Sequence, residues 1–383
     1  MKQSTERILT THCGSLARPK DLLDLMKAKV NGEPVDDAYA RRVRSAVTET
    51  VRKQIDSGID IVTDGEQSKP GFFTYVSERL AGFTPKPGAR FTLFADEVAA
   101  FPEYYEQYFS QAMFGGSVAP LVPMVCTGPV SYRGQEAVRR DIDNLKAATE
   151  GMKPEEVFMP AVAPSGVGMN EYYRTEEEYL HAVAEALRAE YQAIVAAGFL
   201  VQIDDPFLTD VYSDSSLSAA AQQKKAEIYV EALNHGLQGI PADKVRFHTC
   251  YGINEGPRVH DAALKDVLGA MLKVNAGAYS FEAANARHEH EYHLWETVKL
   301  PEGKILIPGV ITHASNIVEH PELIAERLIR YAKLVGRENV IAGTDCGFSS
   351  QATYNPEIHP TVVWAKFQAM AEGARLATRQ LWR

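Results

Sequence analysis

Residues that can bind a metal or carry a proton recur directly after short apolar runs of the chain. In His248-x-Cys250 both side chains lie on one side of an extended segment, because residues i and i+2 share a face. Two sulfurs, one imidazole and one carboxylate form a tetrahedral zinc site. The predicted zinc ligands are therefore His248, Cys250, Glu282 and Cys346. The remaining polar groups at such positions are Asp64, Glu66, Asp204 and Asp205.

The alternative for Cys250 and Cys346 is that both are buried thiols with a packing role. Their positions after successive apolar runs favour the metal site. His12 and Cys13 are adjacent, so they point to opposite faces of a strand and do not readily share an ion. We interpret Cys13 and Cys126 as packing residues.

The elements that must position these residues follow a repeated unit of amphipathic helix, glycine and apolar strand. The unit occurs at 36–66, at 174–205 and from 322 to 348. Strands that alternate with helices pair in parallel through right-handed crossovers. This pattern predicts an α/β fold, a (β/α)8 TIM barrel, as one domain over 1–383.

Nine segments are strand candidates, but a closed barrel needs eight. They are RILTTHCGS, IDIVTDGE, PLVPMVCTG, VFMPAVAP, FLVQIDD, KVRFHTC, AYSFEAA, KILIPGVI and VIAGTDCG. We expect either the region 120–130 or the first candidate to lie outside the barrel. The segment 84–122 has no clear period and is predicted to be an insertion or lid. A doubly wound sheet competes with the barrel, but no GxGxxG turn follows any candidate strand.

In a parallel barrel the carboxyl ends of the strands share one face, where active sites lie. The motifs at that face resemble the catalytic barrel of cobalamin-independent methionine synthase, in a family that includes epoxyalkane:coenzyme M transferase. They are HTCY (248–251), AYSFEAA (278–284), LIPGVITHAS (306–315) and AGTDCGF (342–348), preceded in matching order by TTHCGS, TDGE and QIDDP. The resemblance implies the same four zinc ligands and methyl transfer from a 5-methyltetrahydrofolate-type donor to homocysteine.

The resemblance further implies that Ser15, Glu66 and Asp204 hold the amino-acid part of homocysteine. The chemistry agrees, since a thiol with a pKa of about 8.5 needs a cation to become a thiolate at neutral pH. Two carboxylates can hold an ammonium by charge-assisted hydrogen bonds. The alternative is that Glu66 and Asp204 pair with a local cation or cap a helix.

One departure from the family puts the alkyl donor in question. The segment VAPSGVGMNEYYR lacks the tryptophan that the resemblance leads us to expect beside the pterin. Tyr172 or Tyr173 could replace it as a flat surface. The alternative substrate pair is coenzyme M with an epoxide, whose sulfonate requires cations. Arg18 and Arg287 are the candidates for that role, with surface salt bridges as their alternative.

Three further sites complete the prediction. His313 follows a strand, where it donates a proton to a leaving group or hydrogen-bonds a loop. Asp345, next to Cys346, orients the loop that contains both residues or a group that supports a metal ligand. His288 or His290 could line the pocket, within a run that otherwise reads as an exposed face.

Composition and charge argue against several classes of protein. The chain has 383 residues and a formal charge of -10, which argues against nucleic-acid binding. It has no apolar run of about 18 residues or more and no secretory leader, so a cytoplasmic enzyme without membrane partners is expected. Four scattered cysteines do not form a disulfide framework, and a homo-oligomer is compatible with the sequence. The rivals are a non-catalytic barrel that binds zinc and thiols, and a metal-free decarboxylase.

Overall fold

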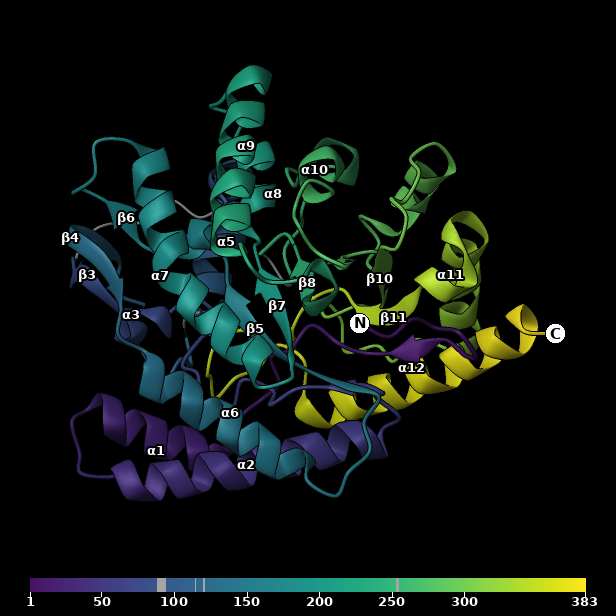
Figure 1. Ribbon diagram of the computed structural model, residues 1–383, viewed down its shortest axis with the longest axis horizontal. Helices are drawn as coiled ribbons and strands as arrows, with labels where there is room; N and C mark the ends of the chain where they lie inside the picture. The colour runs from purple at the N-terminus through teal and green to yellow at the C-terminus, as the bar shows by residue number, and fades with distance from the viewer. Residues whose placement is uncertain (88–93, 114, 120, 253–254) are drawn as a thin grey trace.

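Eight parallel strands form a barrel in the computed structural model, which describes residues 1–87, 94–113, 115–119, 121–252 and 255–383 (Figure 1). The strands are β1 (Leu9–Thr10), β2 (Ile61–Val62), β5 (Glu156–Val162), β7 (Leu200–Asp204), β8 (Val245–His248), β9 (Ala278–Phe281), β10 (Ile305–Ile311) and β11 (Ile341–Thr344). Their order is β1-β11-β10-β9-β8-β7-β5-β2. The amide of Asp60 donates to the carbonyl of Thr10 at 3.1 Å, which links the two end strands and closes the wall. The predicted TIM barrel is confirmed.

Helices surround the barrel, and α2, α7 and α11 lie in the three repeated units that the sequence predicts. They are α1 (Lys20–Val30), α2 (Asp36–Asp56), α3 (Val76–Arg79), α4 (Ala95–Ala100), α5 (Pro102–Tyr108), α6 (Gln135–Thr149), α7 (Glu176–Ala196), α8 (Phe207–Ser213), α9 (Ala219–Gly236), α10 (Leu264–Met271), α11 (Pro321–Val335) and α12 (Pro360–Leu381). Shorter helical turns cover Phe109–Met113, Pro164–Gly166, Ala242–Lys244, Glu289–Glu296 and Arg337–Asn339.

The helix α2 shows why the repeated unit folds as it does. Val43, Val47 and Val51 are buried along one of its faces, as their spacing predicts. Gly58 follows with φ of 84°, a left-handed conformation that favours glycine and turns the chain toward β2.

One layer of side chains fills the barrel interior at the end opposite the predicted site. It consists of Leu9, Ile61, Phe158, Leu200, Ala278, Ile305, Ile307 and Ile341, drawn from seven of the eight strands. The eighth strand, β8, contributes Arg246, whose guanidinium lies 3.8 Å from the centre of the Phe158 ring. The barrel is therefore a packed core that leaves function to the carboxyl ends of the strands.

A second, three-stranded sheet lies outside the barrel. In it β4 (Met124–Tyr132) pairs with β3 (Leu80–Pro85) in antiparallel and with β6 (Met169–Asn170) in parallel. Of the nine strand candidates, the one that covers 120–130 thus lies outside, as one of the two alternatives predicted.

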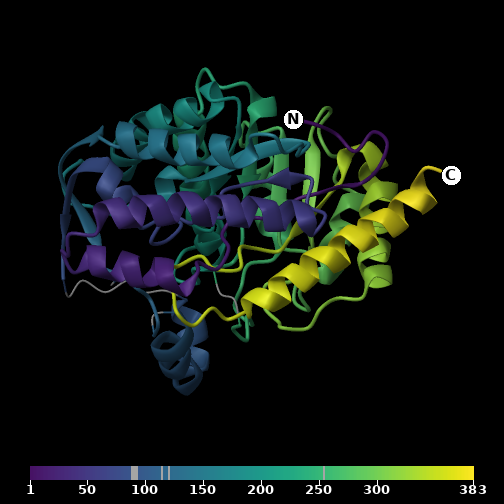
Figure 2. The same cartoon turned by 90° about the horizontal axis from the view of Figure 1, so that it is seen from below.

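The segment 84–122 is more ordered than its sequence suggests. It contains α4 and α5, which project from the body of the barrel as a small blue-grey lobe in Figure 2. Residues 88–93, 114 and 120 of this segment lie outside the described residues.

Over the described part of the chain, no helix combines the length and the apolar character needed to cross a membrane.

Candidate active site

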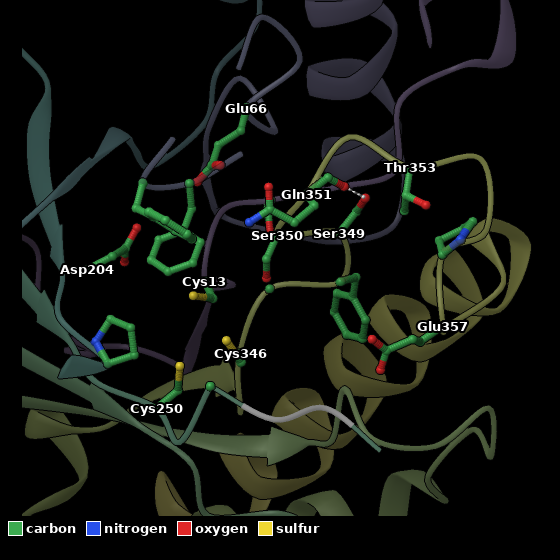
Figure 3. Close-up of a pocket in the computed structure, with 18 of the residues that line it drawn as sticks. Cys13, Glu66, Asp204, Cys250, Cys346, Ser349, Ser350, Gln351, Thr353 and Glu357 are labelled. Carbon is green, nitrogen blue, oxygen red and sulfur yellow. Dashed lines mark hydrogen bonds between the residues drawn. The ribbon is translucent and has the colours of Figure 1, made fainter. Parts of the chain in front are cut away.

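Three cysteines meet at the carboxyl ends of the barrel strands. Cys13 follows β1, Cys250 follows β8 and Cys346 follows β11, and their side chains pack together (Figure 3). One ligand atom from each of Cys13, His248 and Cys346 lies within 4.8 Å of the others. We call Cys13, His248, Cys250 and Cys346 the sulfur cluster. Cys13, which we interpret from the sequence as a packing residue, does pack, and it does so against the two predicted cysteine ligands.

His248 presents a free nitrogen to the sulfur cluster. Its Nδ1 lies 3.1 Å from the hydroxyl of Ser280, while its buried Nε2 has no hydrogen-bond partner among the described residues. Burial and, to a smaller extent, nearby Arg246 lower the pKa of His248 to about 3, so the ring is neutral. A neutral imidazole with one nitrogen held and the other free is the form that binds a metal.

The three thiols are protonated when no cation is present. Burial raises the pKa of Cys13 to about 11. The neighbouring thiol of Cys346 and then burial raise the pKa of Cys250 well above its usual range. The cluster thus combines soft sulfur donors with an unpartnered nitrogen, which are the donors that zinc prefers.

A second group of polar residues lies next to the sulfur cluster. Glu282, His313 and Asp345 each bring one ligand atom within 4.8 Å of the others, and we call them the carboxylate cluster. Asp345 Oδ1 accepts the amides of Ala283 and Ala284 at 2.7 Å each, so it holds the segment that follows β9.

Glu282, a predicted zinc ligand, is held by hydrogen-bond donors. Its Oε2 accepts from Arg258 at 2.5 Å and from Asn285 at 2.8 Å. Its Oε1 accepts the amide of Tyr251 at 3.2 Å. His313 is buried, with Nε2 at 3.4 Å from Arg258 and no partner for Nδ1 among the described residues.

Two carboxylates face the cavity beside the sulfur cluster. Figure 3 shows Glu66 and Asp204 at the cavity wall near Cys13. Glu66 has φ of 57°, an unusual value for a residue other than glycine, and its buried Oε2 has no partner among the described residues. Asp204 Oδ1 accepts from Gln202 at 2.8 Å. Burial raises the pKa of both carboxyls, and their mutual repulsion adds to this for Asp204. An ammonium between them would relieve both effects.

Ser15 also lines the cavity. Its carbonyl accepts the amide of Phe348 at 3.0 Å. A Cβ at Gly347 would lie 2.0 Å from the Ser15 hydroxyl, so the absence of a side chain at Gly347 permits this close approach.

The rest of the cavity wall is aromatic and acidic. Phe72, Phe73 and Phe207 form one wall, with ring centroids 4.9 to 6.5 Å apart. Asp210 and Glu357 also line the cavity. Burial raises the pKa of Asp210 to about 7. The phenylalanines were missed in the sequence, although the pair in KPGFFTY directly follows the TDGE motif.

The tyrosines suggested as a pterin surface lie elsewhere. Tyr172 is half exposed, and the hydroxyl of Tyr173 accepts the amide of Val130 at 3.0 Å. Neither is among the described residues that line the cavity.

Neither predicted sulfonate-binding arginine is among the described residues that line the cavity. Arg18 is buried and donates to the carbonyls of Ser349, Glu66 and Lys69. Arg287 is largely exposed and pairs with Asp261 at 3.1 Å.

The histidines after β9 also lie outside the cavity wall. His288 bridges Asp261 and Glu291, at 2.8 Å each, and stacks on Tyr251. His290 is exposed. His290 thus agrees with the expected exposed face, whereas His288 is buried between its two carboxylate partners.

Comparison with known proteins adds family evidence to this geometry. Residues 163–363 match the family described as the catalytic domain of cobalamin-independent synthase. The chain is 24% identical over 347 residues to a methionine synthase of Sulfolobus acidocaldarius, covering 88% of this chain and 85% of that protein. It is 22% identical over 379 residues to a methionine synthase of Saccharolobus solfataricus, covering 98% and 96%.

Two solved structures share the fold. A B12-independent methionine synthase from Shewanella sp. W3-18-1 in complex with selenomethionine superposes with a TM-score of 0.73 at 20% identity, over 98% of this chain and 99% of that one. A putative vitamin-B12 independent methionine synthase from Listeria monocytogenes gives 0.67 at 19% identity, over 96% and 98%. Because the family model matches more than half of its residues, the chain belongs to the cobalamin-independent synthase family.

Proposed function

We propose that the protein is a zinc-dependent S-methyltransferase that methylates homocysteine to methionine. His248, Cys250 and Cys346 would hold the metal, and both Glu282 and Cys13 lie next to this trio. The single observation that carries the proposal is a pair of buried carboxylates, Glu66 and Asp204, beside the sulfur cluster in one cavity.

The donor atoms fit zinc, since His248 Nε2 is buried without a partner and faces thiol sulfurs. Zinc, when bound, would stabilise the substrate sulfur as a thiolate, the form that attacks an alkyl group. His248 remains fixed in its orientation by Ser280.

The protein's own residues would bind and orient the rest of the substrate. Glu66 and Asp204 would accept hydrogen bonds from the substrate ammonium. Ser15, which follows the carboxyl end of β1, would also bind the amino-acid part. The wall formed by Phe72, Phe73 and Phe207 would exclude water and offer flat surfaces to the methyl donor.

The charges at the cavity favour homocysteine over coenzyme M. Its described lining includes four carboxylates, of Glu66, Asp204, Asp210 and Glu357, and no lysine or arginine. An ammonium is attracted to such a wall, whereas a sulfonate would be repelled and left without a partner.

The donor that we propose is a 5-methyltetrahydrofolate-type compound, with its pterin against the phenylalanines. Because no cation is found in the described lining, carboxylates on the donor's tail would extend past the cavity mouth.

The deciding experiment measures zinc content and methyl transfer together. The purified protein is assayed with homocysteine and 5-methyltetrahydrofolate, and separately with coenzyme M and an epoxide. We expect about one zinc per chain and methionine formation. Turnover of coenzyme M instead of homocysteine would identify the alternative enzyme. Bound zinc with neither turnover would favour the non-catalytic barrel, and a fully active protein without metal would favour metal-free chemistry.

A further inference from the structure

The backbone at Glu66 is held in a conformation that few residues adopt. Its φ of 57° lies in the left-handed region, which is strained for a residue other than glycine. Such strain persists only where the surrounding structure enforces it, and it occurs most often at functional sites. The side chain of Glu66 lines the cavity together with that of Asp204 (Figure 3). Whatever enforces this conformation therefore also sets the position of the carboxylate.

Both backbone polar groups of Glu66 are bound. Its amide donates to Asp64 Oδ1 at 2.9 Å. Its carbonyl accepts the amide of Lys69 at 3.0 Å and Nη2 of Arg18 at 2.9 Å. Asp64 and Lys69 belong to the same turn as Glu66, whereas Arg18 comes from the segment that follows β1. Arg18 thus supports the turn from outside.

Arg18 joins three loops at the carboxyl ends of the barrel strands. Its Nη2 donates to the carbonyls of Glu66 and Lys69 at 2.9 Å each, and its Nη1 donates to the carbonyl of Ser349 at 2.5 Å. These partners follow β2 and β11, and Arg18 itself follows β1. Ser15, Glu66 and Ser349, from the same three loops, line the cavity. A planar guanidinium presents several donors in a fixed arrangement, so one side chain can bind all three carbonyls.

Arg18 binds the backbone of Glu66 and leaves the carboxylate available. Arg18 is buried, and Glu66 Oε2 has no hydrogen-bond partner among the described residues. Burial lowers the pKa of the Arg18 guanidinium, and the charges of Glu66 and Asp64 oppose this effect. The guanidinium therefore stabilises the turn while the oxygens of Glu66 remain free to accept from a ligand.

We propose that Arg18 is a positioning residue of the ammonium site. It ties the loops after β1, β2 and β11 together and holds Glu66 in the left-handed conformation, so the carboxylate faces the cavity before a substrate binds. This inference rests on the proposed function, in which Glu66 binds the substrate ammonium. A site that is already ordered loses less conformational entropy on binding, which increases its affinity. Arg18 thus acts through Glu66 without contacting the substrate.

The first test is the conformation of Glu66 in crystal structures of the native protein, Arg18→Met and Arg18→Lys. In Arg18→Met, φ of Glu66 should leave the left-handed region. Arg18→Lys keeps the charge but has a single nitrogen to donate, so only part of the molecules should retain the native conformation. If both variants keep the native conformation of Glu66, the inference is wrong, whether or not the protein methylates homocysteine.

The second test measures dissociation constants by calorimetry for homocysteine and for 3-mercaptopropanoate, a thiol without an ammonium. Arg18→Met should weaken homocysteine binding about tenfold, the population shift expected when a residue other than glycine is released from the left-handed region. Binding of 3-mercaptopropanoate should change little. In a Glu66→Gln background, Arg18→Met should have little further effect on homocysteine, because the group through which it acts has been altered.

Arg327→Met is the matched control. Arg327 is another buried arginine, and it donates to the carbonyls of Val310 and Ala284 at 3.0 Å each. Its loss should destabilise the fold without changing φ of Glu66 or the ratio of the two dissociation constants.

The outcomes separate this inference from the proposed function. An equal loss of affinity for both thiols in Arg18→Met, or the same change of ratio in Arg327→Met, would mean that Arg18 has a general structural role. A native protein that does not bind homocysteine would contradict the proposed function, and the conformation of Glu66 in the Arg18 variants would still decide what Arg18 does.

Discussion

The sulfur cluster and the carboxylate cluster lie side by side, but their polar atoms differ in whether they have hydrogen-bond partners. In the sulfur cluster, His248 Nε2 has no partner among the described residues, and the thiols contact mainly one another. In the carboxylate cluster, Glu282 and Asp345 accept hydrogen bonds from backbone amides and from Asn285. His313 Nδ1 is the exception there. Buried polar groups without partners are costly, so they indicate a ligand, whereas saturated groups indicate a framework.

The largest expected effect follows from removing a predicted sulfur ligand of the metal. Cys250→Ser or Cys346→Ser should lower kcat/KM by about a thousandfold or more, beyond the 10- to 100-fold typical of residues that only support metal ligands. Zinc content and kcat/KM should fall together. Cys126→Ser is the control. Retention of full activity by either variant would show that the sulfur cluster is a packing feature.

Arg258→Met tests how much the ion pair between Arg258 and Glu282 stabilises the fold. It leaves the Glu282 charge buried without its cation, so the free energy of unfolding should fall by about 3–5 kcal/mol in urea titrations. The double variant Arg258→Met/Glu282→Gln should recover most of this loss. Failure to recover would mean that Arg258 stabilises the fold through contacts other than Glu282.

The two cavity carboxylates provide a test on the substrate side. Glu66→Gln or Asp204→Asn should raise KM for homocysteine about 10- to 100-fold, as expected for one charge-assisted hydrogen bond. A thiol without an ammonium, such as 3-mercaptopropanoate, should bind both variants no worse than the native protein. An equal loss for both thiols would contradict ammonium binding.

The smallest effect concerns the stability of the unliganded protein. Burial raises the pKa of Asp204, so the native state keeps a proton that the unfolded chain releases near pH 3.8. The free energy of unfolding should therefore fall as the pH rises above that value. Asp204→Asn should flatten this dependence and stabilise the protein by roughly 1 kcal/mol at pH 8. Urea titrations at pH 5 and pH 8 measure how the free energy of unfolding changes with pH. An Asp204→Asn variant with the same pH dependence as the native protein would contradict this prediction.

Local patterns in the sequence predict much of this fold. The helix α2 and Gly58 illustrate why, since a buried stripe of valines and a left-handed glycine are properties of neighbouring residues. The place of β4 is different, because a strand pattern does not specify which sheet a strand joins. The helices α4 and α5 span six and seven residues, too few to establish a period.

The sequence likewise predicts one part of the candidate site and not another. His248 and Cys250 share a strand end, so their proximity follows from strand geometry. Cys13 meets them only because β1 closes the barrel against β11, which is a contact between distant parts of the chain. The partner of Glu282 was missed because Arg258 lies in an irregular segment between β8 and α10.

The hydroxyl of Thr344 joins the chain segments that follow the first and the last barrel strands. Cys13 leaves the ribosome early and Cys346 near the end of synthesis, so an incomplete polypeptide cannot assemble all the sulfurs. Under the proposed zinc dependence, tight zinc uptake should thus report that the final strand has docked against the first.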